Sequence, residues 1–541
     1  MEQNQSQRRG YAVGVQEFTW LRERKSVYVD KTEYIWKMVS TEAKNFFLSR
    51  PRRFGKSLLV DTLRCYFEGR KELFEGLYIY DKEKEWRQYP VIRLDLSNGK
   101  YYEKERVHTT IHTILKWQEE KFGITELEDP LNYDARLTNL IREAYRQTGQ
   151  QVVILIDEYD APMLDSINDW ELQDYIRNRI RSLFSPLKAQ AQYLRFVFLT
   201  GISKFSQLSV FSELNNLQQL TFDPAYEAIC GITEEELLTQ MKPEIEQLCV
   251  KRNRLDERYG IVNTFDSIVA ELKHWYDGYQ FSRNMTDVYC PWSLLNAFSF
   301  GDIMNFWFST GTPTSLINIL RTRTNISLAE LEGYQAKMSR FDAPTERITD
   351  PIPALYQSGY LTLKAYDRRR NDWTLGFPNE EVREGFAECL YKYYMEDYVG
   401  SGDMLGNAFN DLRFKEKSFE EFIEVVRRWY AGIPYSITDK NQNEQLYQSL
   451  IYAALVAVGA DVQAEDQTAD GRMDIALKLS DAIYILELKY NKSAEEATDQ
   501  IIAKDYAVRF AHDARPVWAV GLNISQDRRT IDACRIVQVK G

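Results

Sequence analysis

The chain has 541 residues, of which 27% are charged and 13% aromatic, and its formal net charge is −12. This length and composition predict a folded protein of several domains, each able to bury its own core, and no apolar run is long enough to span a membrane. The acidic balance excludes a protein that binds nucleic acid through its overall charge, so any contact with DNA has to use a local basic groove.

Cysteine usage and the start of the chain bear on the compartment. The six cysteines are scattered without CxxC spacing, and residues 1–5 begin no signal peptide. This pattern favours a reducing cytoplasm over a disulfide framework or a zinc cluster. We therefore expect a cytoplasmic protein with no membrane partner.

The first chemical motif resembles a phosphate-binding loop. An apolar run, Asn45–Ser49, predicts a strand, and a helical pattern begins after the loop. The loop reads Arg50-Pro51-Arg52-Arg53-Phe54-Gly55-Lys56-Ser57. Backbone N–H groups in such a turn, together with the helix N-terminus, form a concave positive surface for phosphate oxygens. The usual pattern has glycine where this chain has Arg50, so a basic turn before a helix stays the alternative interpretation.

The loop predicts a nucleotide site that contains Mg²⁺. Lys56 is expected to reach the β- and γ-phosphates, and the Ser57 hydroxyl is expected to ligate Mg²⁺. The residues expected to line the phosphates are Arg52, Arg53, Phe54, Gly55, Lys56 and Ser57. ATP is the expected ligand.

A pair of carboxylates supports this prediction. Asp157 and Glu158 follow the aliphatic run Val152–Ile156, which is typical of a strand buried on both faces in a parallel sheet. Ligands bind at the carboxyl edge of such sheets. Asp157 is therefore expected to hold the Mg²⁺ shell, and Glu158 to polarise the attacking water as a general base. The alternative is a strand that simply ends at polar residues.

Two further apolar runs, Val91–Leu96 and Leu194–Leu199, predict more strands of the same sheet. Thr200 and Ser203 follow the second run, and either hydroxyl could contact the γ-phosphate or the attacking water. We include Thr200 in the predicted nucleotide site. Strands that alternate with helical segments predict a three-layer α/β/α domain of the P-loop ATPase type.

The middle of the chain is expected to be mainly helical. Residues 234–238 open a helix with acids in its first turn, which suits the helix dipole. Aromatic-rich turns lie at residues 274–281 and 305–313, and a packed lid or helical subdomain is their simplest interpretation. We expect a P-loop domain at 1–235, a helical lid or winged-helix-like region at 236–405, and a nuclease-like domain at 406–541.

The last hundred residues carry a second set of charged side chains. Glu487 and Lys489 alternate with leucines in a predicted strand, so both lie on one face, and Asp474 lies in the preceding strand. Asp474 and Glu487 could bind Mg²⁺, and Lys489 could orient a water for phosphodiester hydrolysis. Glu444, on a predicted helix, could add a ligand or a supporting contact. An amphipathic strand with a surface Glu–Lys pair stays the alternative.

Several of these motifs occur together in known proteins. In the first half they are residues 28–32, 50–57, 156–160 and 211–217, followed by the turns at 276–279 and 309–313. With these motifs the chain resembles the AAA-ATPase-like proteins of Bacteroidetes and other anaerobic bacteria, in which arginine at position 50 is typical. Residues 471–474, 487–489 and 500–506 resemble the PD-(D/E)xK nuclease-like domain that is usually fused to this ATPase. The resemblance implies a restriction-endonuclease-like α/β fold at the C-terminus.

The motifs and the resemblance together imply an ATPase whose nucleotide state regulates a Mg²⁺-dependent nuclease. The expected substrate is nucleic acid, DNA in preference to RNA, in defence against foreign DNA or in mobile-element biology. Two alternatives stay open: a nucleotide-dependent switch whose C-terminal domain binds a partner or nucleic acid without cutting, and an ATPase that only remodels protein. An arginine finger, worth roughly 10³–10⁵ in rate, could come from Arg181, Arg195 or Lys204, or from a neighbouring subunit in a homo-oligomer.

Overall fold

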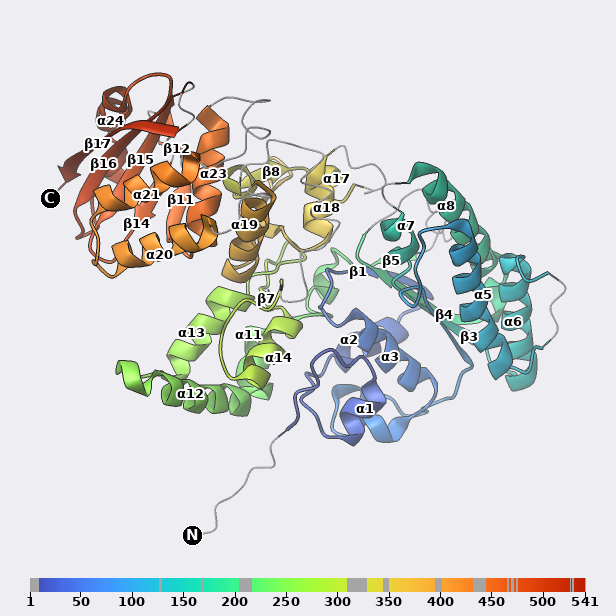
Figure 1. The fold of residues 1–541 in the computed structure, drawn as a ribbon. Coiled ribbons are helices and arrows are strands. Elements are labelled where there is room, and N and C mark those ends of the chain that lie inside the picture. Colours follow the sequence, from blue (N-terminus) through green and yellow to red (C-terminus); the bar gives the residue numbers. More distant parts are fainter. Residues whose placement is uncertain are drawn as a thin grey trace, which may run out of the picture. The chain divides into compact units, whose positions relative to one another are not determined.

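The computed structural model describes residues 9–125, 129–166, 169–203, 217–308, 328–343, 350–394, 401–431, 444–464, 467–468, 471–472, 475–525, 527 and 530–540. The chain forms two compact units (Figure 1). The first comprises Met1–Ser309 and Gln335–Asn379, and the second comprises Thr310–Tyr334 and Glu380–Gly541. The boundaries expected near residues 235 and 405 stay predictions.

A five-stranded sheet lies at the centre of the first unit, with the strand order β2-β3-β4-β1-β5. Its strands are β1 (Asn45–Ser49), β2 (Val91–Asp95), β3 (Val152–Asp157), β4 (Leu194–Gly201) and β5 (Leu217–Gln219). Every neighbouring pair is parallel. All six residues of β3 are buried, as expected for an aliphatic run inside a parallel sheet. The carboxyl ends of β1, β3 and β4 therefore meet at one edge.

Helices cover both faces of this sheet. On one side lie α1 (Phe18–Glu23), α2 (Thr32–Val39) and α3 (Lys56–Phe67); on the other lie α5 (Lys104–Lys121), α6 (Tyr133–Thr148) and α8 (Trp170–Phe184) (Figure 1). Alternate residues of a strand point to opposite faces of the sheet. Ile154 and Ile156 join the core beneath α5, α6 and α8, whereas Arg93 faces Asp61 of α3. The predicted three-layer α/β/α fold is confirmed.

The rest of the first unit is mainly helical and has an apolar core of its own, to which Leu237, Ile245, Leu272 and Leu294 contribute. Its helices include α11 (Glu234–Gln240), α12 (Lys242–Asp256), α13 (Phe265–Tyr276), α14 (Pro291–Phe300) and α18 (Pro351–Gln357). Its strands are β6 (Ile232–Thr233) and β7 (Val288–Tyr289), then β8 (Tyr334–Ala336), β9 (Thr362–Asp367) and β10 (Asp372–Gly376). Thr233 and Glu236 form a capping box at the start of α11, which explains why the acidic run opens a helix there.

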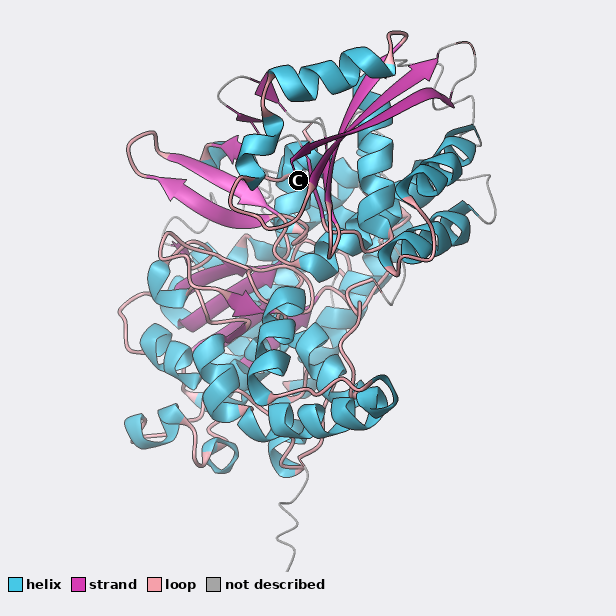
Figure 2. Cartoon of the chain, turned by 90° about the vertical axis from the view of Figure 1, so that its left-hand side faces the viewer, coloured by secondary structure: helices cyan, strands magenta, loops and turns pink. Residues whose placement is uncertain are grey.

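The second unit contains a mixed five-stranded sheet in the order β11-β14-β15-β16-β17. Its strands are β11 (Val462–Ala464), β14 (Ile475–Lys478), β15 (Ile483–Tyr490), β16 (Val517–Ser525) and β17 (Thr530–Lys540). Its helices include α19 (Glu380–Tyr394), α20 (Ser401–Arg413), α21 (Phe419–Ala431), α23 (Glu444–Ala457) and α24 (Ala494–Ala503). Among the paired strands of this sheet, β15 and β16 run parallel, whereas the other pairs are antiparallel. Figure 2 shows the strands of the chain gathered in separate sheets. The α/β fold predicted for the C-terminal part is confirmed.

Two properties concern the whole described chain. Each of its six cysteines is a free thiol. No helix within the described ranges combines the length and the apolar character needed to cross a bilayer.

Gly521 of β16 allows α24 to lie close against the sheet. A Cβ at this position would overlap the carbonyl oxygen of Ala494 and lie 2.9 Å from the backbone nitrogen of Thr498. We expect Gly521→Ala to lower the free energy of unfolding of this unit by about 1–3 kcal/mol, because α24 has to move outward. Urea titration followed by circular dichroism measures the change.

Gly406→Ala in α20 of the same unit is the matched control. A Cβ there would lie 3.8 Å from Cγ1 of Val458, an ordinary packing distance. This substitution is expected to raise helix stability by about 0.5–1 kcal/mol. Equal effects of the two substitutions would contradict the close approach of α24.

Candidate nucleotide and nuclease sites

The segment after β1 turns into α3 at Gly55. Gly55 has a φ of 87° and stands at the N-cap of α3. A Cβ on Gly55 would meet no atom within 4 Å, so the space in front of the helix N-terminus is open. This geometry leaves the first N–H groups of the helix facing an open concavity, which is the arrangement that binds phosphate.

Lys56 is buried within the loop. Its Nζ donates to the carbonyl oxygens of Arg50 and Pro51, each at 3.0 Å, and lies 3.8 Å from the carboxylate of Glu158. The ammonium group is thus held between the loop backbone and the expected general base. Glu158 itself has a φ of 50°, an uncommon conformation for a residue with a side chain, which is often found at functional sites.

Asp157 ends β3 behind Ser57. Its carboxyl accepts a hydrogen bond from Ser57, which lowers its pKa, yet burial outweighs this and raises the pKa of Asp157 to about 6. Its Oδ1 has no hydrogen-bond partner among the described residues. Asp95 of β2 lies opposite Asp157 in the parallel register and also raises its pKa. A serine hydroxyl beside a buried carboxylate with an unsatisfied oxygen fits Mg²⁺, which prefers hard oxygen ligands.

The end of β4 forms another wall of this region. Thr200 lies opposite Leu48 of β1, is fully buried, and its hydroxyl has no partner within the described residues. Asp160 holds the next turn, because its Oδ2 accepts the N–H groups of Ile202 at 3.0 Å and Ser203 at 2.6 Å. Burial raises the pKa of Asp160. The structure thus places Thr200 between the loop strand and the strand of Asp157.

A cavity of about 520 Å³ lies beside the loop. Its polar wall includes Arg52, Gly55, Lys56, Ser57 and Glu158, whereas Asp157 and Thr200 are not among the lining residues. Its apolar wall includes Val15, Ile229, Ile232, Trp292 and Leu295. The volume lies within the range of small-molecule sites, and a charged end beside an apolar end suits a nucleotide.

Arg50, where a glycine is usual, lies beneath the loop and not at the phosphate side. Its guanidinium is 1% exposed and stands 4.1 Å from the ring centre of Phe281. It donates to four backbone carbonyl oxygens at 2.9–3.3 Å, those of Ser49, Thr221, Tyr226 and Glu227. Burial lowers the pKa of Arg50 to about 10, so the group stays charged at neutral pH. Arg50 is an anchor of the loop.

Two residues expected to line the phosphates use their side chains for packing. The Arg53 guanidinium lies 5.0 Å from the ring of Trp292 and donates to the carbonyl oxygen of Trp307. Phe54 is buried, with its ring 4.7 Å from that of Tyr279. Both residues line the cavity. Sequence reasoning could not see these packing partners.

The expected sources of an arginine finger differ in position. Arg195 begins β4, at the opposite end from Thr200, and donates to the carbonyl oxygen of Val39 at 3.4 Å. Five strand steps separate these two positions by roughly 16 Å, so Arg195 lies at the far end of β4 from the nucleotide loop of its own chain, and its action from a neighbouring subunit stays a prediction. Arg181 is an exposed residue of α8, and Lys204 lies outside the described residues.

In the second unit, β15 carries Glu487 and Lys489 on one face. Lys489 Nζ donates to Glu487 Oε1 at 3.0 Å, and both side chains are buried. Gln500 of α24 donates to the same oxygen and lies 3.3 Å from the hydroxyl of Tyr506. Gln500 belongs to the 500–506 motif, which is expected on a helix packed beside this site, and α24 places it there. The strand and helix thus bring an acid, a cation and an amide together.

Two further predicted ligands are not placed by the structure. Asp474 lies outside the described residues, and so does the side chain of Glu444, although α23 begins at that residue. Ile475, next to Asp474, pairs with Leu486 in β15. Within the described part of the chain no group of three or more His, Cys, Asp or Glu side chains could hold a metal. Of the three predicted ligands Glu444, Asp474 and Glu487, Glu487 is the one whose side chain is described.

Comparison with known proteins identifies both halves of the chain. Residues 12–211 match the family described as "Predicted AAA-ATPase", and residues 442–534 match the "PD-(D/E)XK nuclease superfamily". A protein of Azotobacter chroococcum mcd 1, named "Uncharacterized protein in vnfD 5'region", is 32% identical over 542 residues. That alignment covers 97% of this chain and 98% of the relative. The two regions therefore occur together, over the same length, in another protein.

Replacing Arg50 tests its role as an anchor. We expect Arg50→Gly, which restores the usual loop glycine, to lower the free energy of unfolding by about 2–4 kcal/mol, because buried carbonyl oxygens lose their donor. Urea titration measures this change. Arg52→Gly, at the exposed neighbouring arginine, is the control and is expected to cost less than about 1 kcal/mol. Equal losses in the two variants would show that the guanidinium contacts do not support the loop.

Proposed function

Because the chain belongs to the family of predicted AAA-ATPases that end in a domain of the PD-(D/E)XK nuclease superfamily, we propose that it binds and hydrolyses ATP. Its nucleotide state would regulate Mg²⁺-dependent cleavage of nucleic acid by the second unit. One observation carries the ATPase part: Lys56, Ser57 and Glu158 line one cavity, with Asp157 hydrogen-bonded to Ser57. These are the groups that hold phosphate, metal and water in P-loop enzymes.

Each group in this cavity has a separate task. The N–H groups of the loop and of α3 bind phosphate oxygens, and Lys56 exchanges its loop carbonyl partners for them. Ser57 and Asp157 would hold Mg²⁺, which neutralises phosphate charge when bound. Glu158 orients the attacking water and accepts its proton, with the Lys56 ammonium 3.8 Å from its carboxylate. The Thr200 hydroxyl serves as a further donor at the same sheet edge.

The second unit is proposed to cleave a phosphodiester bond, in DNA in preference to RNA. Glu487, with Asp474 and Glu444, would hold Mg²⁺, which supplies an activated water and charge neutralisation. Lys489 orients that water and stabilises negative charge on the phosphate. Gln500 keeps the Glu487 carboxylate in position. Defence against foreign DNA or mobile-element biology is the cellular setting that we attach to this proposal.

A nucleotide-dependent switch is the second candidate. It is favoured by the state of Glu487, which is 1% exposed and accepts from both Lys489 and Gln500. A carboxylate engaged in this way could support a binding domain that holds nucleic acid or a partner without cutting it. The two candidates share the ATP site and differ in whether Glu487 is needed for a covalent change in the substrate.

Substitutions in the first unit test the ATP site. Glu158→Gln is expected to keep ATP affinity within about threefold and to slow hydrolysis by at least about 100-fold, because the general base is lost. Lys56→Ala is expected to weaken ATP binding at least about tenfold, since a charge-assisted hydrogen bond is removed. Titration with a fluorescent ATP analogue and a phosphate-release assay measure the two quantities.

Glu235→Gln, at an exposed acid of α11, is the matched control and is expected to behave as the wild type. Unchanged hydrolysis in Glu158→Gln would remove Glu158 from the proposed mechanism. Unchanged ATP affinity in Lys56→Ala would contradict the assignment of the cavity.

Incubation of the full chain with Mg²⁺ and supercoiled or linear DNA, with and without ATP, tests the nuclease. Glu487→Gln and Lys489→Ala are each expected to reduce cleavage at least about 100-fold, since metal binding and water orientation are lost. Lys417→Ala, at an exposed lysine of the same unit outside these motifs, is the control and is expected to cut as the wild type does. If the wild type hydrolyses ATP but never cuts nucleic acid, the nucleotide-dependent switch is favoured.

A further inference from the structure

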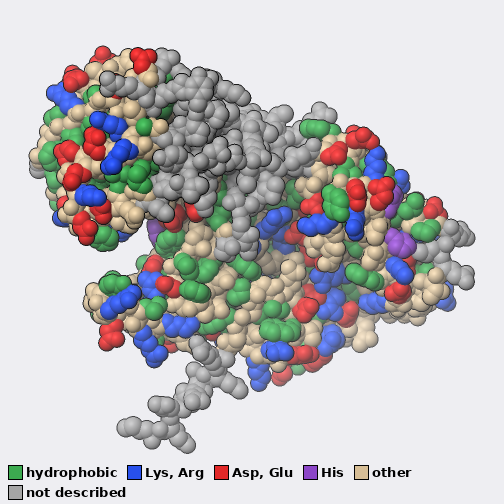
Figure 3. Space-filling model, in the orientation of Figure 1, with side chains coloured by type: hydrophobic (Ala, Val, Ile, Leu, Met, Phe, Trp, Pro, Cys, Tyr) green, Lys and Arg blue, Asp and Glu red, His purple; other side chains and the backbone are tan. Residues whose placement is uncertain are grey.

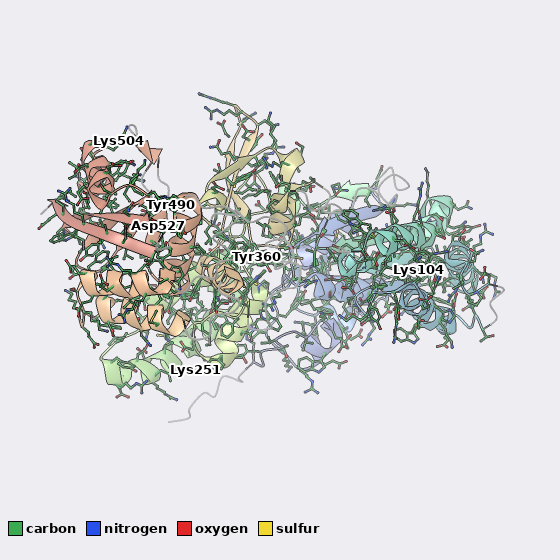
Figure 4. The ribbon with its side chains drawn as sticks, turned by 45° about the horizontal axis from the view of Figure 1, so that its top comes forward. Lys104, Lys251, Tyr360, Tyr490, Lys504 and Asp527 are labelled. Carbon is green, nitrogen blue, oxygen red and sulfur yellow. The ribbon has the colours of Figure 1, made fainter. Side chains whose placement is uncertain are left out.

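The hairpin β9–β10 of the first unit ends in a run of arginines. Its strands are antiparallel, with Asp367 opposite Asp372 as the last pair. Arg368, Arg369, Arg370 and Asn371 form the connecting loop. Tyr360, buried just before the hairpin, is labelled in Figure 4. The loop therefore projects three adjacent cationic side chains from an ordered pair of strands.

Hydrogen bonds and ring packing hold the end of this hairpin in one shape. Asp367 Oδ1 accepts the N–H groups of Arg369 at 2.8 Å and of Arg370 at 3.2 Å. The Tyr366 hydroxyl donates to Asn371 Oδ1 at 2.9 Å, and its ring centre lies 4.4 Å from that of the buried Trp373. A preformed loop loses little conformational freedom when its side chains bind a ligand.

The arginine side chains are accessible and weakly paired. All three loop arginines and nearby Arg283 are exposed, and the Arg283 guanidinium lies 5.8 Å from the ring centre of Tyr366. Arg370 Nε lies 3.9 Å from an oxygen of Asp367, a distance at which an exposed pair is worth little. No carboxylate of the described residues lies within 4 Å of Arg368 or Arg369.

This cluster contrasts with the charge of the whole chain, which is −12. On the face seen in Figure 3, Lys and Arg side chains of the described residues are interspersed with Asp and Glu. A generally acidic protein repels a polyanion except where cations are concentrated locally. The hairpin is such a place.

We propose that this arginine hairpin, residues 362–376 together with Arg283, binds the phosphate backbone of duplex DNA. The inference rests on the proposed action of the chain on nucleic acid and names the surface that holds it. Guanidinium groups bind phosphate with two parallel hydrogen bonds, which lysine cannot do, and duplex DNA presents one charge per about 1.7 Å of its axis. Contacts of this kind position the DNA without reading its sequence.

The hairpin is anchored to the segment that supports the nucleotide loop. Gln280 N donates to Thr362 Oγ1 at 2.9 Å, and Thr362 Oγ1 donates back to the Gln280 carbonyl at 3.1 Å. The neighbours of Gln280 are Tyr279, which packs on Phe54, and Phe281, which lies under Arg50. DNA would thus be held by the ATPase unit itself.

Fluorescence anisotropy with a short labelled duplex, in EDTA so that no cleavage occurs, tests the proposal on the full chain. Arg368→Ala/Arg369→Ala is expected to weaken binding at least about tenfold and to reduce the slope of log affinity against log salt by about 2. The matched control is Arg254→Ala/Arg258→Ala, at exposed arginines of the same unit with the same change in charge. The control is expected to change affinity less than about twofold.

Each outcome decides the proposal. Equal weakening by both pairs, or none by the hairpin pair, overturns it. If the wild type binds and cuts DNA and the hairpin variant binds it equally well, only the role of the hairpin is overturned. If the wild type neither binds nor cuts DNA, the proposed nuclease is overturned as well. Loss of binding to anionic phospholipid vesicles without loss of DNA binding would assign the hairpin to a membrane surface and overturn the proposal.

Arg368→Lys/Arg369→Lys separates geometry from charge and guards against misfolding. It keeps the net charge and is expected to bind DNA between the wild type and the alanine pair, because lysine lacks the two-pronged guanidinium. Thermal unfolding midpoints and circular dichroism spectra of all variants are expected to match the wild type. If the lysine pair bound DNA as weakly as the alanine pair, with both variants folded, a role for positive charge at residues 368 and 369 would also be overturned.

Discussion

The loop of residues 50–57, the proposed nucleotide site, depends on one interaction, the burial of the Arg50 guanidinium beneath it. A charge removed from water is costly unless it is hydrogen-bonded, and here four backbone carbonyl oxygens accept from the two Nη groups and the face of Phe281 covers the guanidinium, while Nε has no partner among the described residues. The carbonyls come from the end of β1 and from residues 221–227. The loop is therefore supported from beneath, and its open side stays available for phosphate. A glycine at this position would remove that support.

The order of the strands decides which residues surround the expected phosphate position. Because β4 lies between β1 and β3, Thr200 and Asp157 reach the same edge as Ser57. Burial keeps Asp157 near a pKa of 6 and leaves one of its oxygens without a described partner. An arriving cation would relieve both costs, because opposite charge favours the ionised carboxylate. Mg²⁺ at the proposed position would offset this free-energy cost.

The second unit solves a similar problem with different elements. Glu487 is buried in the central strand and its charge is met by Lys489 from the same strand and Gln500 from α24. Gly521 lets the backbone of α24, the helix that carries Gln500, lie close to the sheet. In both units a buried charged group is hydrogen-bonded by more than one segment: backbone carbonyl oxygens accept from Arg50, whereas Lys489 and Gln500 donate to Glu487.

The sequence alone determined β1 to β4, β14 and β15, the loop and the chemistry of its residues, because aliphatic runs, glycine positions and period-two alternation are local signals. These signals predicted the three-layer fold, the Lys56–Glu158 region and the Glu487–Lys489 face. Tertiary structure decided the role of Arg50, whose partners include Thr221, the packing of Phe54, and the places of Asp95, Asp160 and Gln500. The physical reason is that these contacts join residues far apart in the chain. Their geometry follows from strand order and helix docking, which no local pattern encodes.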